Sequence, residues 1–197
     1  MHRKRLTGAV TAVALAAVVV TTGAVARTAP HRAAAHQAAP TQTTIHLTPS
    51  SPQLAACMPE ATVTVRVLST TDTLGFDKFR ITAHELPPNR AYTVFLLQKA
   101  KSPFGAAEYI GDIFTDAEGD ASNEFHLIVD EAFSSTLVGG QRVRVDLNRV
   151  GMWFASPRGD DFCPAAPGTD GVTPFDGDNE AGVQAFNSAG AQPLPAP

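Results

Sequence analysis

The chain has 197 residues, 44% of them hydrophobic and 17% charged, and its formal net charge is −4. An apolar fraction of this size excludes a chain that is disordered throughout, and the length suits one folded core better than two. The negative charge disfavours partners that are themselves anionic, namely nucleic acids and anionic lipid surfaces.

The first 26 residues have the pattern of a secretory signal peptide. A basic start, Arg3 to Arg5, precedes a mainly apolar run from Ala9 to Val20. Such a run is short for a membrane span, and residues 24–26 supply the A-x-A pattern that signal peptidase recognises. We therefore expect export, with a mature chain that begins at Arg27 and carries a formal charge of −7. The alternative is an uncleaved membrane anchor, since mild apolarity continues to residue 26.

The two cysteines of the chain are Cys57 and Cys163. In an oxidising compartment such a pair is most simply a disulfide. It would close a loop of about a hundred residues, for which the chain-entropy model gives roughly 4–5 kcal/mol of stabilisation. The alternatives are a metal site or a reactive thiol, and neither has a CxxC motif or a neighbouring histidine in its favour.

Residues 27–58 are rich in Ala, Thr, Pro and Gln, and they predict a flexible spacer. From residue 61 the apolar side chains recur with period two, which indicates strands separated by turns. The run 92–97 is apolar on both parities, as in a central strand covered on both faces. Strands are predicted at 62–67, 78–84, 92–97, 109–115, 124–130, 142–148, 152–154 and 183–186.

Two local structures are predicted between these strands. Residues 109–115 and 124–130 are expected to form a hairpin, because Gly119 and the neighbouring aspartates suit a tight turn with positive φ. Residues 131–136 are predicted as a helical turn.

Seven or eight short strands and no strong helix predict an all-β fold, an antiparallel β-sandwich over residues 59–188. Residues 159–182 contain six acids and no Lys or Arg, so they are expected to form a long acidic loop pinned at Cys163. A disordered Pro/Ala-rich tail is predicted for residues 189–197.

Two segments carry a resemblance to known modules. Leu86-Pro87-Pro88-Asn89-Arg90-Ala91-Tyr92-Thr93-Val94 resembles the L-P-x-x-x-x-Y-x-V corner of immunoglobulin-like and fibronectin type III-like modules. Phe114-Thr115-Asp116-Ala117-Glu118-Gly119 is similar to the strand–turn signature of the same group. As a whole, residues 60–190 look like uncharacterised secreted β-sandwich proteins of GC-rich bacteria. The resemblance implies an immunoglobulin-like architecture and carries no site residues.

The strongest metal-site hypothesis is a calcium site made by Asp176, Asp178 and Glu180. Their alternate positions would let a looped backbone direct three carboxylates at one hard cation. Further acids of the loop could supplement them: Asp160, Asp161 and Asp170. A solvated acidic loop without metal explains the same residues.

Two histidines and three aromatic residues are further candidates for binding or catalysis. His84 and His126 lie on the polar parity of their strands, so they could share a surface as a weak transition-metal site, or simply be exposed strand histidines. Aromatic residues could form a sugar platform, but the strand positions of Tyr92, Tyr109 and Trp153 predict that they belong to the core.

The chain lacks G-x-S-x-G and Ser-x-x-Lys motifs with their companions. The sequence therefore predicts a secreted, non-catalytic module for binding, adhesion or attachment to the envelope, with no cofactor, no nucleic-acid partner and no membrane span in the mature chain. The alternative is a calcium- or other metal-dependent extracellular enzyme or metal-binding protein that uses the acidic loop at 160–180.

Export with cleavage can be tested directly. When the full chain is produced in an exporting bacterial host, intact-mass and N-terminal analysis should find a product that begins at Arg27, because residues 24–26 fit signal peptidase. A product that retains the apolar run and stays in the membrane fraction would favour the anchor instead.

Overall fold

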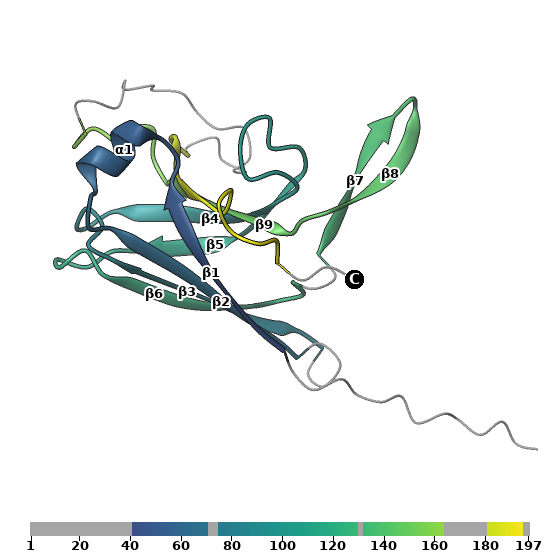
Figure 1. The fold of residues 1–197 in the computed structure, drawn as a ribbon, viewed down its shortest axis with the longest axis horizontal. Coiled ribbons are helices and arrows are strands. Elements are labelled where there is room, and N and C mark those ends of the chain that lie inside the picture. The colour runs from purple at the N-terminus through teal and green to yellow at the C-terminus, as the bar shows by residue number, and fades with distance from the viewer. Residues whose placement is uncertain (1–40, 71–74, 130–131, 164–180, 195–197) are drawn as a thin grey trace, which may run out of the picture. The chain divides into compact units, whose positions relative to one another are not determined.

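The computed structural model describes residues 41–70, 75–129, 132–163 and 181–194. In this part of the chain the fold is all-β with one short helix, as predicted (Figure 1). The elements are β1 Thr41–Pro49, α1 Pro52–Cys57, β2 Thr62–Ser69, β3 Asp77–His84, β4 Ala91–Leu97, β5 Ala107–Phe114, β6 Ala121–Leu127, β7 Phe133–Val138, β8 Gln141–Asp146, β9 Arg149–Phe154 and β10 Gln184–Asn187.

Eight strands form one antiparallel arrangement in the order β5-β4-β9-β10-β1-β2-β3-β6. β1 joins its two halves, because residues 41–47 pair with β2 whereas Thr48 and Pro49 pair with β10. In Figure 1, β2, β3 and β6 form the lower layer, and β4 and β9 lie above them. The strands thus enclose one interior in the manner of a sandwich that approaches a barrel.

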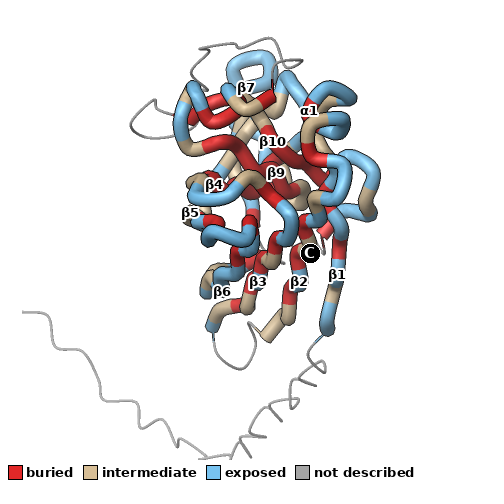
Figure 2. The backbone as a smooth tube through the Cα atoms, turned by 90° about the vertical axis from the view of Figure 1, so that its left-hand side faces the viewer, coloured by how far each residue is buried: buried red, intermediate tan, exposed pale blue. Residues whose placement is uncertain are grey.

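The predicted period-two pattern places the core between the layers. On β2 and β3 alternate side chains are buried, and the residues between them face outward (Figure 2). The buried members on these strands are Val63, Val65, Val67, Phe79, Ile81 and Ala83. All six side chains from Tyr92 to Leu97 are buried, which confirms that β4 is covered on both faces.

The outer face of β4 and β9 carries a second, smaller apolar cluster. Phe95, Leu97 and Trp153 belong to it, and Phe104 packs against it from the loop between β4 and β5. The Trp153 ring makes edge contacts with Phe95 and Phe104, with ring centroids 5.2 and 5.0 Å apart. This cluster explains why β4 and β9 are apolar on both parities.

The predicted hairpin of residues 109–130 is wrong. β5 pairs with β4 and β6 pairs with β3, so the two strands lie at opposite ends of the strand order. The chain crosses from one layer to the other at residues 115–120. Period two locates both strands correctly, but it carries no information about which strand each one pairs with.

The predicted spacer and helical turn also need correction. Residues 41–49 of the spacer form β1 and residues 52–57 form α1, so the domain begins earlier than residue 59. The sequence does not predict β1 because this strand contributes only Ile45 and Leu47 to the core. Its other residues are mainly threonines, so the period-two apolar pattern is too short to indicate a strand. The helical turn expected at 131–136 is replaced, from Phe133 onward, by β7.

The predicted disulfide between Cys57 and Cys163 is confirmed, with an S–S distance of 2.09 Å. Cys57 ends α1, a helix capped by Ser51, whose hydroxyl accepts a hydrogen bond from the Leu54 amide at 3.1 Å. The bond therefore ties the segment after β1 to a point 106 residues later in the chain. Within the described residues, no helix is long and apolar enough to cross a membrane.

The two segments that carry the family resemblance pack against each other. The Thr115 hydroxyl donates to the Pro87 carbonyl at 2.7 Å and accepts from the Arg90 amide at 2.9 Å. The Leu86 amide donates to the Gly119 carbonyl at 3.1 Å. Gly119 has φ +86°, and a Cβ atom there would lie 2.1 Å from the Leu86 carbonyl oxygen. Only glycine fits where the chain passes between the layers.

Gly119→Ala should lower the free energy of unfolding by about 3 kcal/mol, since it adds both left-handed strain and a clash with backbone. The matched control is Gly140→Ala, at φ +82° in open space, which should cost about 1 kcal/mol from conformation alone. Urea denaturation of the oxidised proteins measures both values. Equal losses would show that the corner at Gly119 is not tightly packed.

Candidate functional site

The three carboxylates of the calcium hypothesis, Asp176, Asp178 and Glu180, lie outside the described residues, as does Asp170. In the part of the chain that is described, no group of three His, Cys, Asp or Glu side chains comes together. Asp160 is buried rather than solvated, and it lines a cavity of about 480 Å³ beside α1. The other described side chains around that cavity are serines, glutamines, apolar groups and the cation Lys101.

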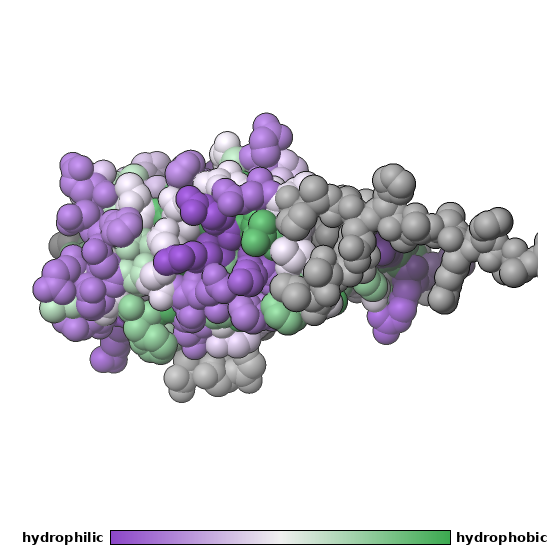
Figure 3. Space-filling model, turned by 90° about the horizontal axis from the view of Figure 1, so that it is seen from below, coloured by the Kyte–Doolittle hydropathy of each residue, from purple (hydrophilic) through white to green (hydrophobic). Residues whose placement is uncertain are grey.

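His84 and His126 both lie on the outer face of the β3–β6 pair, as their parity predicts, and this face is largely hydrophilic (Figure 3). They are nevertheless far apart. His126 lies opposite Lys78, and His84 is six residues further along β3, which places it roughly 20 Å away. The structure therefore does not bring the two histidines together at one metal.

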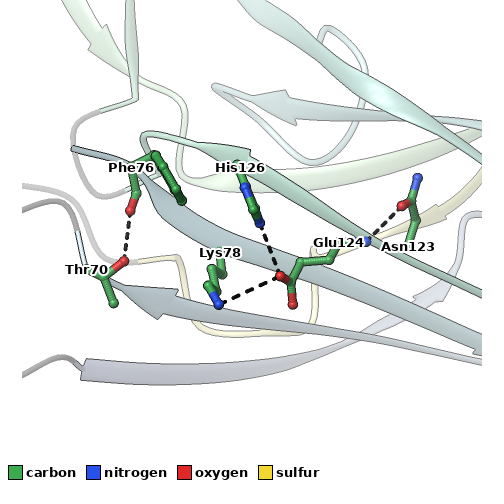
Figure 4. Close-up of polar contacts among 6 residues, drawn as sticks. All are labelled: Thr70, Phe76, Lys78, Asn123, Glu124 and His126. Atoms are coloured by element: carbon green, nitrogen blue, oxygen red, sulfur yellow. Dashed lines mark hydrogen bonds and ion pairs between the residues drawn. The ribbon is translucent and has the colours of Figure 1, made fainter. Parts of the chain in front are cut away.

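Each histidine instead contacts a carboxylate. His126 Nε2 lies 3.2 Å from Glu124 Oε1, and the Lys78 ammonium approaches the same oxygen at 4.0 Å (Figure 4). The Phe76 ring stacks on His126, with centroids 4.7 Å apart. About half of these polar side chains is exposed, so solvent screens the pairs and they contribute little to stability.

At the other end of this face, His84 Nδ1 lies 3.1 Å from Asp120 Oδ1. The pair borders a shallow hollow whose lining includes Arg80, Asp116 and the exposed ring of Phe114. An aspartate that orients a histidine is one part of acid–base machinery. Both side chains are at least half exposed, so solvent screens this pair as it does the pair at His126.

The Tyr92 hydroxyl is a titratable group whose pKa is shifted strongly by burial. Its ring packs on Phe154 in the core, and its hydroxyl is buried without a hydrogen-bond partner. Burial raises the pKa of this hydroxyl above its ordinary value of about 10, and the charge of Arg90 opposes the shift. A neutral phenol locked between sheets serves packing rather than catalysis. Tyr92 and Trp153 are buried as predicted, whereas Tyr109 is exposed.

The most distinctive surface is a two-stranded sheet separate from the sandwich, formed by β7 and β8 (Figure 1). We call residues 133–146 the β7–β8 arm. Val138 pairs with Gln141 across a two-residue turn, Gly139 and Gly140, at φ +57° and +82°. Positive φ at both central positions is what a type I′ turn requires, and this turn suits the twist of a hairpin.

The arm exposes apolar side chains on both of its faces. Strand pairing places Phe133 and Leu137 on one face and Val138 and Val143 on the other. Their exposed fractions are 55, 65, 60 and 44%, and the described residues contain only three further large hydrophobic side chains this exposed. The arm therefore carries four of the seven exposed large hydrophobic side chains in the described part of the chain.

Two arginines lie on the same face as Phe133 and Leu137. Arg144 lies over the Phe133 ring, 4.2 Å from its centroid, and its Nε lies 3.2 Å from Asp146 at the base of the arm. Arg142, nearer the turn, donates a hydrogen bond to the Ser135 hydroxyl at 3.0 Å. From residue 133 to residue 145 the arm contains no acidic side chain.

The base of the arm is held firmly. Val129 and Leu147 flank it and are buried, and the Leu147 amide donates to the carbonyl of Ala132 at 2.9 Å. The buried carboxylate of Asp77, at the start of β3, accepts from the Val129 amide at 2.8 Å and from the Thr70 amide at 2.8 Å. The sandwich thus presents an exposed hairpin that carries apolar side chains on both faces and two arginines on one of them.

Sequence reasoning overlooked the arm as a site. The available signal was Gly139-Gly140 between short runs of β-branched residues, the pattern of a two-residue hairpin. It was missed because Ser134, Ser135 and Thr136 weaken the apolar alternation of the first strand.

No model of a known protein family, no curated protein and no solved structure matches the chain.

Tyr92→Phe should raise the free energy of unfolding by about 1 kcal/mol at neutral pH, because it removes a buried hydroxyl that has no partner. In the unchanged protein, stability should fall above pH 10, where the unfolded chain releases the phenolic proton and the folded chain keeps it. Tyr92→Phe should weaken this alkaline loss. Tyr109→Phe, which removes a hydroxyl bonded to Asp112, is the control and should show no gain. Urea titrations at several pH values measure these effects, and a stability loss in Tyr92→Phe would contradict the assignment.

Proposed function

We propose that this chain is an exported, non-catalytic module that attaches to the cell envelope through the β7–β8 arm. The observation that carries the proposal is the exposure of Phe133, Leu137, Val138 and Val143 on a hairpin separate from the sandwich. The leader-like residues 1–26 and the disulfide support an oxidising destination outside the cytoplasm.

Physical chemistry supports a binding role for the arm. A two-stranded hairpin is at best marginally stable in water, and exposed apolar side chains add a risk of aggregation. Here such a hairpin is anchored at its base by Asp77 and by the buried residues beside it. A hairpin that exposes apolar side chains to water, and whose base is fixed to the sandwich, has the properties of a surface that binds a partner.

The alternative is a metal-dependent protein that acts through residues 160–180. Its ligands Asp176, Asp178 and Glu180 lie outside the described residues, and no observation on the described ones favours it.

The double substitution Leu137→Ser with Val138→Ser should lower the affinity of the exported protein for isolated bacterial envelopes at least ten-fold, since two exposed apolar side chains would no longer be buried on binding. Stability should be unchanged, because both positions face solvent. The amount of protein that co-sediments with envelopes measures the affinity.

The matched control for this experiment is Phe114→Ser, which removes an even more exposed apolar side chain, on β5 rather than on the arm. It should bind as well as the unchanged protein. The proposal is overturned if the protein does not co-sediment, or if the arm variant and the control bind alike.

A further inference from the structure

We infer that the β7–β8 arm is an interfacial anchor for an anionic lipid bilayer. Leu137 and Val138 at its turn would enter the boundary between head groups and acyl chains, while Arg142 and Arg144 would contact lipid phosphates. This inference rests on the proposed function, since it names the partner of the same surface. Three observations favour a bilayer over a protein partner.

The first observation is that both faces of the arm are apolar near the turn. Leu137 and Val138 are neighbours on one strand, so their side chains point to opposite faces, and both are at least 60% exposed. A flat protein partner would cover one face and leave the other in water. An apolar medium that surrounds the turn covers both faces at once.

The second observation is the charge of the arm. The arm carries two arginines and one acid, Asp146 at its base, so its formal charge is +1 within a chain whose formal net charge is −4. The hydrogen bond that the structure gives Arg142 goes to an uncharged hydroxyl, and the contact between Arg144 and Asp146 is half exposed and hence weak. Arginine is suited to phosphate oxygens, because its guanidinium group offers several donors in one plane.

The net charge of the chain does not cancel this local attraction. Six residues of extended strand are roughly 20 Å long, whereas the Debye length at physiological ionic strength is about 8 Å. Charges on the sandwich are therefore largely screened at the turn of the arm. The expectation that an acidic chain avoids anionic lipids applies to the body of the domain and not to this hairpin.

The third observation is size. The two strands of the arm have six residues each, whereas a stable protein–protein interface uses roughly 20 or more residues on each side. Pairing with the arm of a second copy through the face of Phe133 and Leu137 would also bring the arginines of both copies together. A bilayer needs no complementary shape, and a few apolar side chains combined with two cations give it a weak, reversible attachment.

The test uses the exported full chain and two kinds of vesicle, one of equal parts phosphatidylcholine and phosphatidylglycerol and one of phosphatidylcholine alone. Flotation measures the partition coefficient. The protein should bind the anionic vesicles much more strongly, and high salt should weaken that binding. Near-ultraviolet circular dichroism and urea titration verify that every variant is folded.

Two variants separate the charge from the apolar contact. Arg142→Gln with Arg144→Gln should lower the partition coefficient on anionic vesicles about 25-fold, because each cation near such a surface contributes ~1 kcal/mol. Lys99→Gln with Lys101→Gln, which removes two exposed lysines elsewhere, should change it little. Leu137→Ser with Val138→Ser should lower binding to both kinds of vesicle.

The possible outcomes distinguish this inference from the proposed function. Absence of vesicle binding, or binding that none of the arm variants changes, overturns the lipid inference. If the arm variants nevertheless lose binding to envelopes, the partner is an envelope protein or glycan and the proposed function stands. If neither envelopes nor vesicles bind through the arm, both proposals fall.

Discussion

The fold depends on one strand that belongs to both layers. β1 pairs with β2 along most of its length and with β10 at Thr48 and Pro49, so the backbone hydrogen bonds of one strand hold the two halves around a single interior. Ile45 and Leu47 supply its share of the core. Directly after β1, α1 leads to Cys57, whose bond to Cys163 fastens this junction to a distant part of the chain. The strand pairing of β1 and the disulfide therefore both stabilise the segment in which the two layers are joined.

The rest of the domain is arranged around that closed interior. The crossing at residues 115–120 is held by Thr115 and by the close approach of Gly119 to Leu86, and it sends β6 to the opposite end of the strand order from β5. The side-chain amide of Asn123 (Nδ2) donates to the backbone carbonyl of Asp112 at 3.1 Å, so the two end strands still meet. On the outer face of β3 and β6, the charged side chains form exposed, weak pairs.

The β7–β8 arm differs from the sandwich because it exposes several large apolar side chains. Its base is anchored by the Asp77 carboxylate and by buried residues on either side, whereas its turn carries Leu137, Val138 and Arg142 into solvent. Stability thus comes from the sandwich, and the arm is left available for contact. This division supports a module whose function lies in attachment, and the same geometry leads to the lipid inference.

Much of the secondary structure follows from the sequence because burial with period two is a local property. Residues 62–67, 78–84 and 92–97 form strands as predicted, and Gly119 lies at a turn with positive φ. Where apolar residues are sparse, the pattern fails, and for this reason β1 and β7 were assigned to a spacer and a helical turn. The histidines lie on the predicted face, but period two says nothing about their separation along it.

By itself, the sequence determined an all-β domain with a leader-like start, one disulfide and alternating strands, since each of these depends on neighbouring residues or on a count of cysteines. Only the tertiary structure decided that β5 and β6 pair with different strands, that β1 joins the layers and that the arm is left uncovered. Strand partners and exposure depend on contacts between residues far apart in the chain, and the alternation within one strand is the same whichever neighbour it meets.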